Sequence, residues 1–150
     1  MFVLTAKVTK SKILIVSLIA VFALLFMFFG LGAKKQAQNV NVSASTITER
    51  QSFLKQFGWQ IDSKSETVRA FSVPAVFDNV LKEYNSLQKK QGFDLTKFKD
   101  KKAICYTYNI SNYPNKPTGI LATLLVSDGK IIGGDIHSSE LSGFMHGFKK

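Results

Sequence analysis

Four residues near the C-terminal end have side chains of the kind that hold metal ions or move protons. Asp135, His137, Glu140 and His146 lie within twelve positions and include both histidines of the chain. Carboxylates and imidazoles are common ligands of zinc and related metals. The spacing matches no established ligand motif, however, and ordinary surface loops after a Gly-Gly pair carry the same residue types. The sequence therefore favours a surface loop, and no metal ligand is predicted.

The same segment contains the residue types of a serine hydrolase. Ser138, Ser139 and Ser142 lie close in sequence to His137 and His146. Nucleophilic catalysis needs a hydroxyl beside a histidine that an acid orients, and the chain has no Gly-x-Ser-x-Gly elbow. A small hydrolase or metal-dependent enzyme using the segment from His137 to His146 is therefore the alternative hypothesis. No catalytic residue and no cofactor are predicted.

Two other places carry reactive groups. Ser52 and Lys55 form Ser-x-x-Lys, the nucleophile motif of penicillin-interacting enzymes, but the companion Lys-Thr-Gly is missing. A domain of about a hundred residues is also too small for that fold, so we interpret the match as coincidence. Cys105 is the only cysteine, which excludes a disulfide within the chain. We expect it to be a small buried hydrophobic residue.

Two sets of side chains have the chemistry of binding rather than reaction. Six lysines form a candidate patch for teichoic-type polymers or lipid headgroups: Lys89, Lys90, Lys97, Lys99, Lys101 and Lys102. Three tyrosines are candidates to line a ligand groove: Tyr106, Tyr108 and Tyr113. Solvated connections and half-buried strand packing are the commoner explanations of such sets. The formal charge of +10 is also too dispersed for a nucleic-acid-binding stripe, so no nucleic-acid partner is predicted.

An uninterrupted apolar segment near the N-terminus indicates on which side of a membrane these side chains would lie. Residues 13–31 contain no charge, and as a helix they would span roughly 28 Å, close to the thickness of a bilayer core. We expect residues 13–32 to be a transmembrane signal-anchor helix embedded in the lipid bilayer. Three lysines before it and two after it favour a short basic cytoplasmic segment, residues 1–12, and an exported C-terminal part. A cleaved signal peptide is the competing interpretation.

The rest of the chain divides into a linker and one domain. Residues 33–46 are polar and aperiodic, which is typical of a linker, and residues 47–150 are long enough for one extracytoplasmic domain. Thr46 and Glu49 match a capping box, which predicts a helix ending near Gly58.

A second helix is predicted to begin at Pro74 and to end at Gly92. Its apolar residues recur every three or four positions: Phe77, Val80, Leu81, Tyr84 and Leu87. Between the two helices we expect one extended region, from Trp59 to Val73, interrupted by a polar turn at residues 62–65.

The C-terminal half predicts three strands. Residues 104–110 alternate bulky and slim side chains, and residues 120–126 are apolar on both faces and should be central. Asp128-Gly129 predicts a two-residue turn that pairs Val126 with Ile131 and Leu125 with Ile132. Gly133-Gly134 should end or bulge the last strand, Asp135-Ile136 should leave it, and the tail should hold one helical turn.

These elements predict an α+β fold. Two helices should cover one face of an antiparallel sheet that ends in a three-stranded meander, giving two layers.

Several blocks of residues also carry a resemblance: Phe57-Gly58-Trp59, Glu83 to Leu95, Tyr106-Thr107-Tyr108, Asn112-Tyr113-Pro114, Ile132-Gly133-Gly134-Asp135 and Gly143-Phe144-Met145-His146-Gly147.

Together these blocks resemble a family of small membrane-anchored clostridial proteins that contains a domain of unknown function. The resemblance implies a bacterial single-pass membrane protein and transfers no activity. The leading hypothesis is a membrane-tethered extracytoplasmic domain that binds a protein, a peptide or an envelope component, such as an anionic polymer, without catalysis.

Overall fold

The computed structural model describes residues 42–116, 118–140 and 142–149. The predicted transmembrane helix and residues 33–41 of the predicted linker lie outside these ranges. Within them, no helix is long and apolar enough to cross a bilayer. The helical elements are α2 (Ile47–Lys55), α3 (Asn79–Lys90) and the 3-10 helix η1 (Leu95–Phe98).

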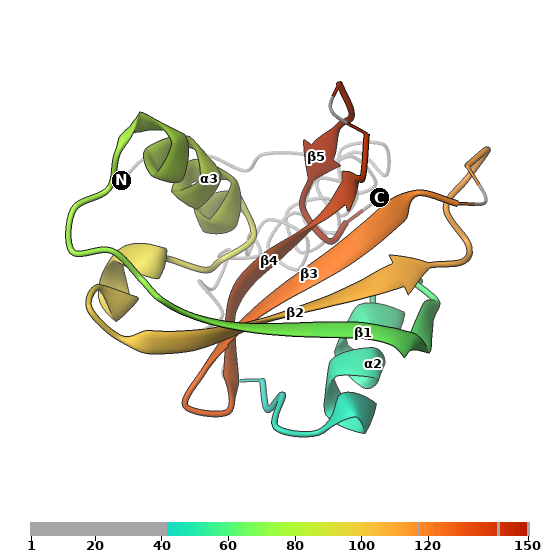
Figure 1. The fold of residues 1–150 in the computed structure, drawn as a ribbon, viewed down its shortest axis with the longest axis horizontal. Coiled ribbons are helices and arrows are strands. Elements are labelled where there is room, and N and C mark those ends of the chain that lie inside the picture. The colour runs from blue at the N-terminus through green and yellow to red at the C-terminus, as the bar shows by residue number, and fades with distance from the viewer. Residues whose placement is uncertain (1–41, 117, 141, 150) are drawn as a thin grey trace, which may run out of the picture. The chain divides into compact units, whose positions relative to one another are not determined.

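The strands form one five-stranded antiparallel sheet in the order β1-β2-β3-β4-β5 (Figure 1). They are β1 (Ile61–Ser72), β2 (Lys102–Ile110), β3 (Ile120–Ser127), β4 (Lys130–Ser138) and β5 (Met145–His146). The α+β class is confirmed, and β3 is central as its two apolar faces predicted. The expected three-stranded meander gains β1 on one side and β5 on the other.

The first helix follows its sequence signals. The backbone N–H of Glu49 donates to the Thr46 hydroxyl at 3.2 Å, and the Thr46 N–H donates to the Glu49 carboxylate at 2.9 Å. Gly58 closes the C-terminal end with φ +82°. The packed structure begins before this helix: Ala44 is fully buried, and its N–H donates to the Gly129 carbonyl at 2.8 Å.

The second helix departs from the prediction. It begins at Asn79, because Asp78 caps it by accepting a hydrogen bond from the Leu81 N–H at 2.7 Å. Pro74 is therefore not in its first turn. The predicted apolar face is also rotated, since Val80 is 76% exposed whereas Asn85 and Gln88 are buried.

Two strand predictions are corrected. The turn expected at residues 62–65 is a bulge inside the single strand β1, where the pairing with β2 shifts register. In the β3–β4 hairpin, Asp128 and Gly129 have the positive φ values that the turn requires. Val126 pairs with Ile131 as predicted, but a second bulge sets Leu125 opposite Gly133.

The C-terminal end also differs from the prediction. Strand β4 does not end at the Gly-Gly pair, because Asp135 and Ile136 continue its pairing with β3. Beyond it, Met145 and His146 pair with β4 as β5, where a helical turn was expected. A strand is the better solution because it supplies backbone partners to the outer side of β4.

The two helices lie on opposite faces of the sheet, so the domain has three layers instead of two (Figure 1). The first face, which carries Tyr108, Leu124 and Ile136, packs against α2. The second face, which carries Leu125 and Ile132, packs against α3 and η1. The alternation of side chains along each strand divides the apolar residues between the two cores.

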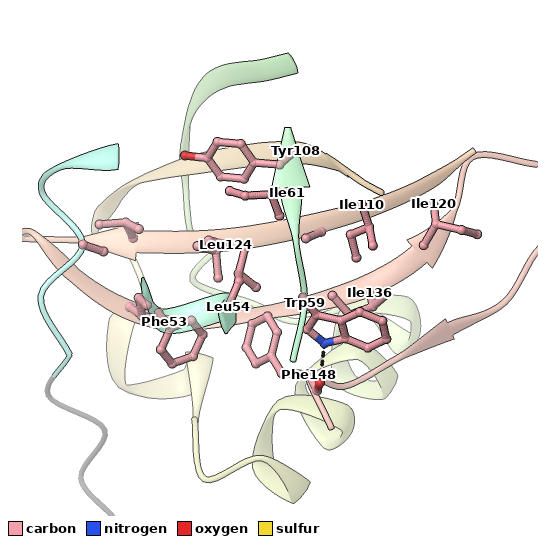
Figure 2. Close-up of a cluster of buried hydrophobic side chains, with 14 of the residues drawn as sticks. Phe53, Leu54, Trp59, Ile61, Tyr108, Ile110, Ile120, Leu124, Ile136 and Phe148 are labelled. Atoms are coloured by element: carbon pink, nitrogen blue, oxygen red, sulfur yellow. Dashed lines mark hydrogen bonds between the residues drawn. The ribbon is translucent and has the colours of Figure 1, made fainter. Parts of the chain in front are cut away.

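The first face holds the larger core, with fifteen buried hydrophobic residues against six on the second face. Figure 2 shows Phe53 and Leu54 of α2 against Phe148 and the strand residues. The Trp59 indole N–H donates to the Phe148 carbonyl at 2.6 Å, which fastens the C-terminal segment across this core (Figure 2).

Candidate functional site

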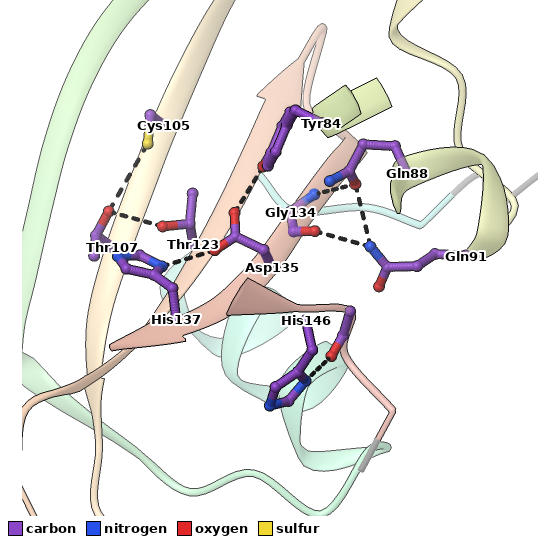
Figure 3. A network of polar contacts seen from close by, with 11 residues as sticks. Tyr84, Gln88, Gln91, Cys105, Thr107, Thr123, Gly134, Asp135, His137 and His146 are labelled. Atoms are coloured by element: carbon purple, nitrogen blue, oxygen red, sulfur yellow. Dashed lines mark hydrogen bonds and ion pairs between the residues drawn. The ribbon is translucent and has the colours of Figure 1, made fainter. Parts of the chain in front are cut away.

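A chain of three polar side chains crosses the second face. Asp135 of β4 is 2% exposed, and its two carboxylate oxygens have different partners. Oδ2 accepts from the Tyr84 hydroxyl of α3, and Oδ1 contacts Nδ1 of His137, both at 2.7 Å (Figure 3). Asp135 and His137 share a face because they are two positions apart on one strand. We call these three residues the polar relay.

The relay fixes the chemistry of His137. A carboxylate only accepts hydrogen bonds, so the Nδ1 facing Asp135 carries the proton and Nε2 of the neutral ring is the basic atom. Nε2 makes no hydrogen bond within the described residues, and the side chain is 24% exposed. Burial, followed by the negative charge of Asp135, raises the pKa of Tyr84, which keeps its hydroxyl a donor. A buried acid orienting a half-exposed base is an arrangement that can transfer protons.

Two glutamines at the C-terminal end of α3, one within the helix and one at its cap, contact the Gly-Gly pair beside the relay. Gly134 donates its N–H to Gln88 Oε1 at 2.8 Å, and its carbonyl accepts from Gln91 Nε2 at 2.9 Å (Figure 3). A Cβ at Gly133 would lie 2.9 Å from Gln88 Oε1. The glutamines thus take the place of a neighbouring strand at the outer side of β4. Gln88 is fully buried in this position.

The sheet separates the residues that the metal hypothesis grouped. His146 pairs with Ile136 on the first face, and its ring stacks on Phe144, away from His137 (Figure 3). Glu140 lies 3.8 Å from the Lys116 ammonium group. Across the described residues, no three His, Cys, Asp or Glu side chains are grouped to hold a metal ion.

The serines do not complete a hydrolase site in the described structure. Ser138 pairs with Ile120 on the first face, and its hydroxyl accepts from the Glu140 N–H at 3.2 Å. Ser139 and Ser142 are exposed, and neither is a partner of His137 Nε2.

Ser52 and Lys55 are both exposed on α2. Cys105 is half-buried on the second face, 3.8 Å from the Thr107 hydroxyl, so its expected full burial is not found.

Part of the predicted lysine patch assembles around a hollow. A concavity of about 450 Å³ between α3 and η1 is lined by Lys82, Lys89 and Lys99 together with uncharged residues. We call it the basic concavity. Lys82 was not among the predicted lysines, although its seven-residue spacing from Lys89 places both on one side of a helix. Lys101 lies elsewhere, over the ring of Phe98.

The three tyrosines pack separately instead of lining one groove. Arg50 of α2 lies over the Tyr106 ring at 3.7 Å and donates from Nε to the Tyr108 hydroxyl at 2.7 Å. Tyr108 donates to Glu66, and burial together with that carboxylate raises the pKa of Tyr108 to about 12. Tyr113 stacks on Trp59 with ring centroids 5.5 Å apart.

Arg50 is the central residue that sequence reasoning missed. It is 4% exposed, and it also donates to the Ala44 carbonyl at 2.7 Å and to Glu66 at 2.9 Å. Its spacing from Phe53 and Leu54 places it on the apolar side of α2, and this signal could have revealed a buried charge. Its hydrogen-bond partners lie 5 to 58 positions away and carry no local signal.

The fold and the relay together define a small α+β domain with a five-stranded meander and an acid-oriented histidine at one face. The chain matches the domain of unknown function DUF4830 over residues 53–136, more than half of its length. It therefore belongs to this family, which confirms the domain-of-unknown-function part of the expected resemblance. No curated protein and no solved structure matches the chain significantly.

Proposed function

We propose that the chain is a bacterial single-pass membrane protein whose C-terminal domain, residues 47–150, lies outside the cytoplasmic membrane. Residues 13–32 would anchor it in the lipid bilayer, with the N-terminus in the cytoplasm. The domain binds an anionic, phosphate-bearing polymer of the cell envelope without catalysing a reaction. The observation that carries this proposal is the concentration of positive charge around α3 and η1.

The charge of the described domain is uneven. Residues 82–102 contain seven lysines and three acidic residues, whereas the other described residues contain seven basic and seven acidic side chains. All of the excess positive charge of the described residues thus lies in α3, η1 and their connections. A local excess of one sign attracts a ligand of the opposite sign even when the whole surface is only mildly charged.

The shape of this surface suits a polymer segment. The basic concavity has three lysines around it and no acidic residue among the described residues that line it. Asp94 lies just outside, where it approaches the Lys89 ammonium group at 3.8 Å. The hydroxyls of Ser86 and Thr96 bond within the protein, so the lysine ammonium groups provide the attraction. Each ammonium group is a compact positive charge that can pair with the negative charge of one phosphodiester.

Binding of poly(glycerol phosphate) to the full-length protein in zwitterionic nanodiscs tests the proposal. The K82E/K89E/K99E variant should weaken binding by about tenfold or more, because exposed ion pairs each contribute up to about 1 kcal/mol. The K55E/K64E/K130E variant changes the net charge equally at exposed lysines elsewhere and should bind nearly as the wild type does. Equal losses in both variants, or no binding by the wild type, would overturn the proposal.

The location is tested separately in intact bacterial cells. A protease added outside should remove a C-terminal tag and leave an N-terminal tag intact, and washing membranes with salt should not release the protein. A protected C-terminal tag would contradict the proposed orientation. Release by salt would contradict the anchor.

The polar relay favours a second candidate function, a small hydrolase in which His137 is a general base for a bound water. The relay supplies the base and its orienting acid, and a water would supply the nucleophile, since the described residues place none at Nε2. Turnover of nitrophenyl esters and phosphodiesters should be lost in His137→Ala and kept in His146→Ala. A wild-type protein without turnover, or equal loss in both variants, would remove this candidate.

A further inference from the structure

We propose that the second face contains a binding site for a small amphiphile with one apolar chain and an anionic head group. The site is a pocket of about 300 Å³ between α3 and the β1 side of the sheet, distinct from the basic concavity. Its size lies at the lower end of the range of small-molecule sites in proteins. This inference does not depend on the polymer or on the membrane anchor.

The lining of the pocket is apolar and incompletely covered. Phe71, Val73, Leu81 and Leu125 are among the apolar side chains that line it. Phe71 and Leu81 remain partly exposed although they pack against the second core. An apolar chain entering the pocket would remove these side chains from water, which is favourable by about 25 cal/mol per Å² of buried apolar surface.

One charged side chain decides the expected head group. Arg69 of β1 is the single charged residue among the described residues that line the pocket, and it is exposed. Its side chain makes no hydrogen bond or ion pair within the described residues, so its guanidinium group is available to a ligand. The planar guanidinium group matches a carboxylate with two parallel hydrogen bonds. Apolar walls with a cation at the rim therefore fit a medium-chain fatty acid.

Cys105 makes the proposal directly measurable. It lines the pocket, and it is the only cysteine of the full chain, so thiol modification reports on this one place. The full-length protein in zwitterionic nanodiscs is treated with a small thiol reagent while decanoate is raised below its micelle concentration. Decanol is the matched neutral amphiphile. A soluble cysteine peptide mixed with empty nanodiscs corrects for loss of the thiol reagent or the amphiphile into the lipid.

The expected result is saturable slowing of Cys105 modification by decanoate. In Arg69→Gln, which leaves the apolar wall intact, half-saturation should need about 10-fold to 100-fold more decanoate, while protection by decanol should be unchanged. Leu81→Trp, which fills the mouth, should reduce protection by both amphiphiles.

Three results would overturn the proposal. The first is an absence of protection by decanoate in the wild type. The second is equal protection in wild type and Arg69→Gln, which would show that the arginine does not recognise the head group. The third is a Cys105 of the full-length protein that does not react with the thiol reagent even without decanoate, which would show that the pocket is closed to small molecules.

Discussion

The two faces of the sheet are built from the same strands but have different contents. The first face has a core of fifteen buried hydrophobic residues, and a buried arginine joins α2, β1 and β2. The second face buries six, and it carries the polar relay and an apolar pocket. Because most stability comes from buried apolar surface, we infer that the first face maintains the fold and that the second is available for ligands.

The largest expected difference comes from the same substitution on each face. Leu54→Ala removes a fully buried side chain of the first core and should lower the free energy of unfolding by about 3 to 5 kcal/mol. Leu81→Ala removes a half-exposed side chain at the pocket and should cost about 1 kcal/mol. Urea unfolding of the full-length protein in micelles measures both. Equal losses would contradict the division between the faces.

The adjacent glycines provide the next comparison, because they face opposite sides of β4. A Cβ at Gly134 would lie 2.2 Å from the Thr123 carbonyl oxygen and 2.5 Å from the Phe148 ring. Gly134→Ala should therefore destabilise by about 3 kcal/mol, whereas Gly133→Ala displaces only the end of Gln88 and should cost about 1 kcal/mol. Thermal unfolding of both variants under one condition measures the difference. A larger loss at Gly133 would show that the second face is the more rigid one.

A smaller effect compares the buried hydroxyls. Tyr108→Phe removes a donor to Glu66 and an acceptor for Arg50, and it should cost about 2 kcal/mol near neutral pH. The folded-state pKa of Tyr108 is about 12, above its ordinary value of 10, so this contribution is complete below pH 10 and is lost as the pH rises toward 12.

Urea unfolding between pH 8 and 12 should therefore show the gap between wild type and Tyr108→Phe narrowing above pH 10. Tyr84→Phe on the second face should cost about 1 kcal/mol, because Asp135 keeps its contact with His137. A gap that widens with pH would contradict the assigned role of Tyr108.

The smallest effect concerns the connection between α3 and η1. Burial opposes ionisation of Asp94, but hydrogen bonds from Thr96 and Asn85 outweigh it and hold its pKa at about 2. Its contribution is present above the ordinary value of 3.8 and is lost as the pH falls toward 2. Asp94→Asn should cost about 0.5 kcal/mol near neutral pH, and acid titration should show this difference shrink below about pH 4 and nearly vanish at pH 2. A difference that persists at pH 2 would contradict the assigned cause.

Local chemistry made much of the fold predictable. The capping box at Thr46, the turn at Asp128-Gly129 and the apolar central strand were all confirmed, because each depends on residues that are neighbours in sequence. The predicted start of α3 at Pro74 was wrong because Asp78 caps the helix, so its first turn begins at Asn79. The layer arrangement was wrong because period-two patterns show that a strand has two faces, but not which helix covers each.

The candidate site was less predictable. Asp135 and His137 belong to the four residues that the metal hypothesis grouped, and they do lie together. Their grouping with His146 failed, because His146 pairs with Ile136, whose side chain lies on the opposite face of the sheet. Tyr84 joins the relay from 51 positions away in the sequence, and no local sequence pattern predicts such a distant partner. Arg50 was missed for the same reason, because only the folded structure shows that its guanidinium group is paired with Glu66 and Tyr108.

The most direct test is to titrate poly(glycerol phosphate) into two variants at a temperature where both are folded. If stability and binding are divided as proposed, Leu54→Ala binds the polymer with wild-type affinity although it unfolds more easily. The K82E/K89E/K99E variant then loses most of its affinity while keeping wild-type stability. Wild-type affinity in the lysine variant, or loss of affinity in folded Leu54→Ala, would contradict the account.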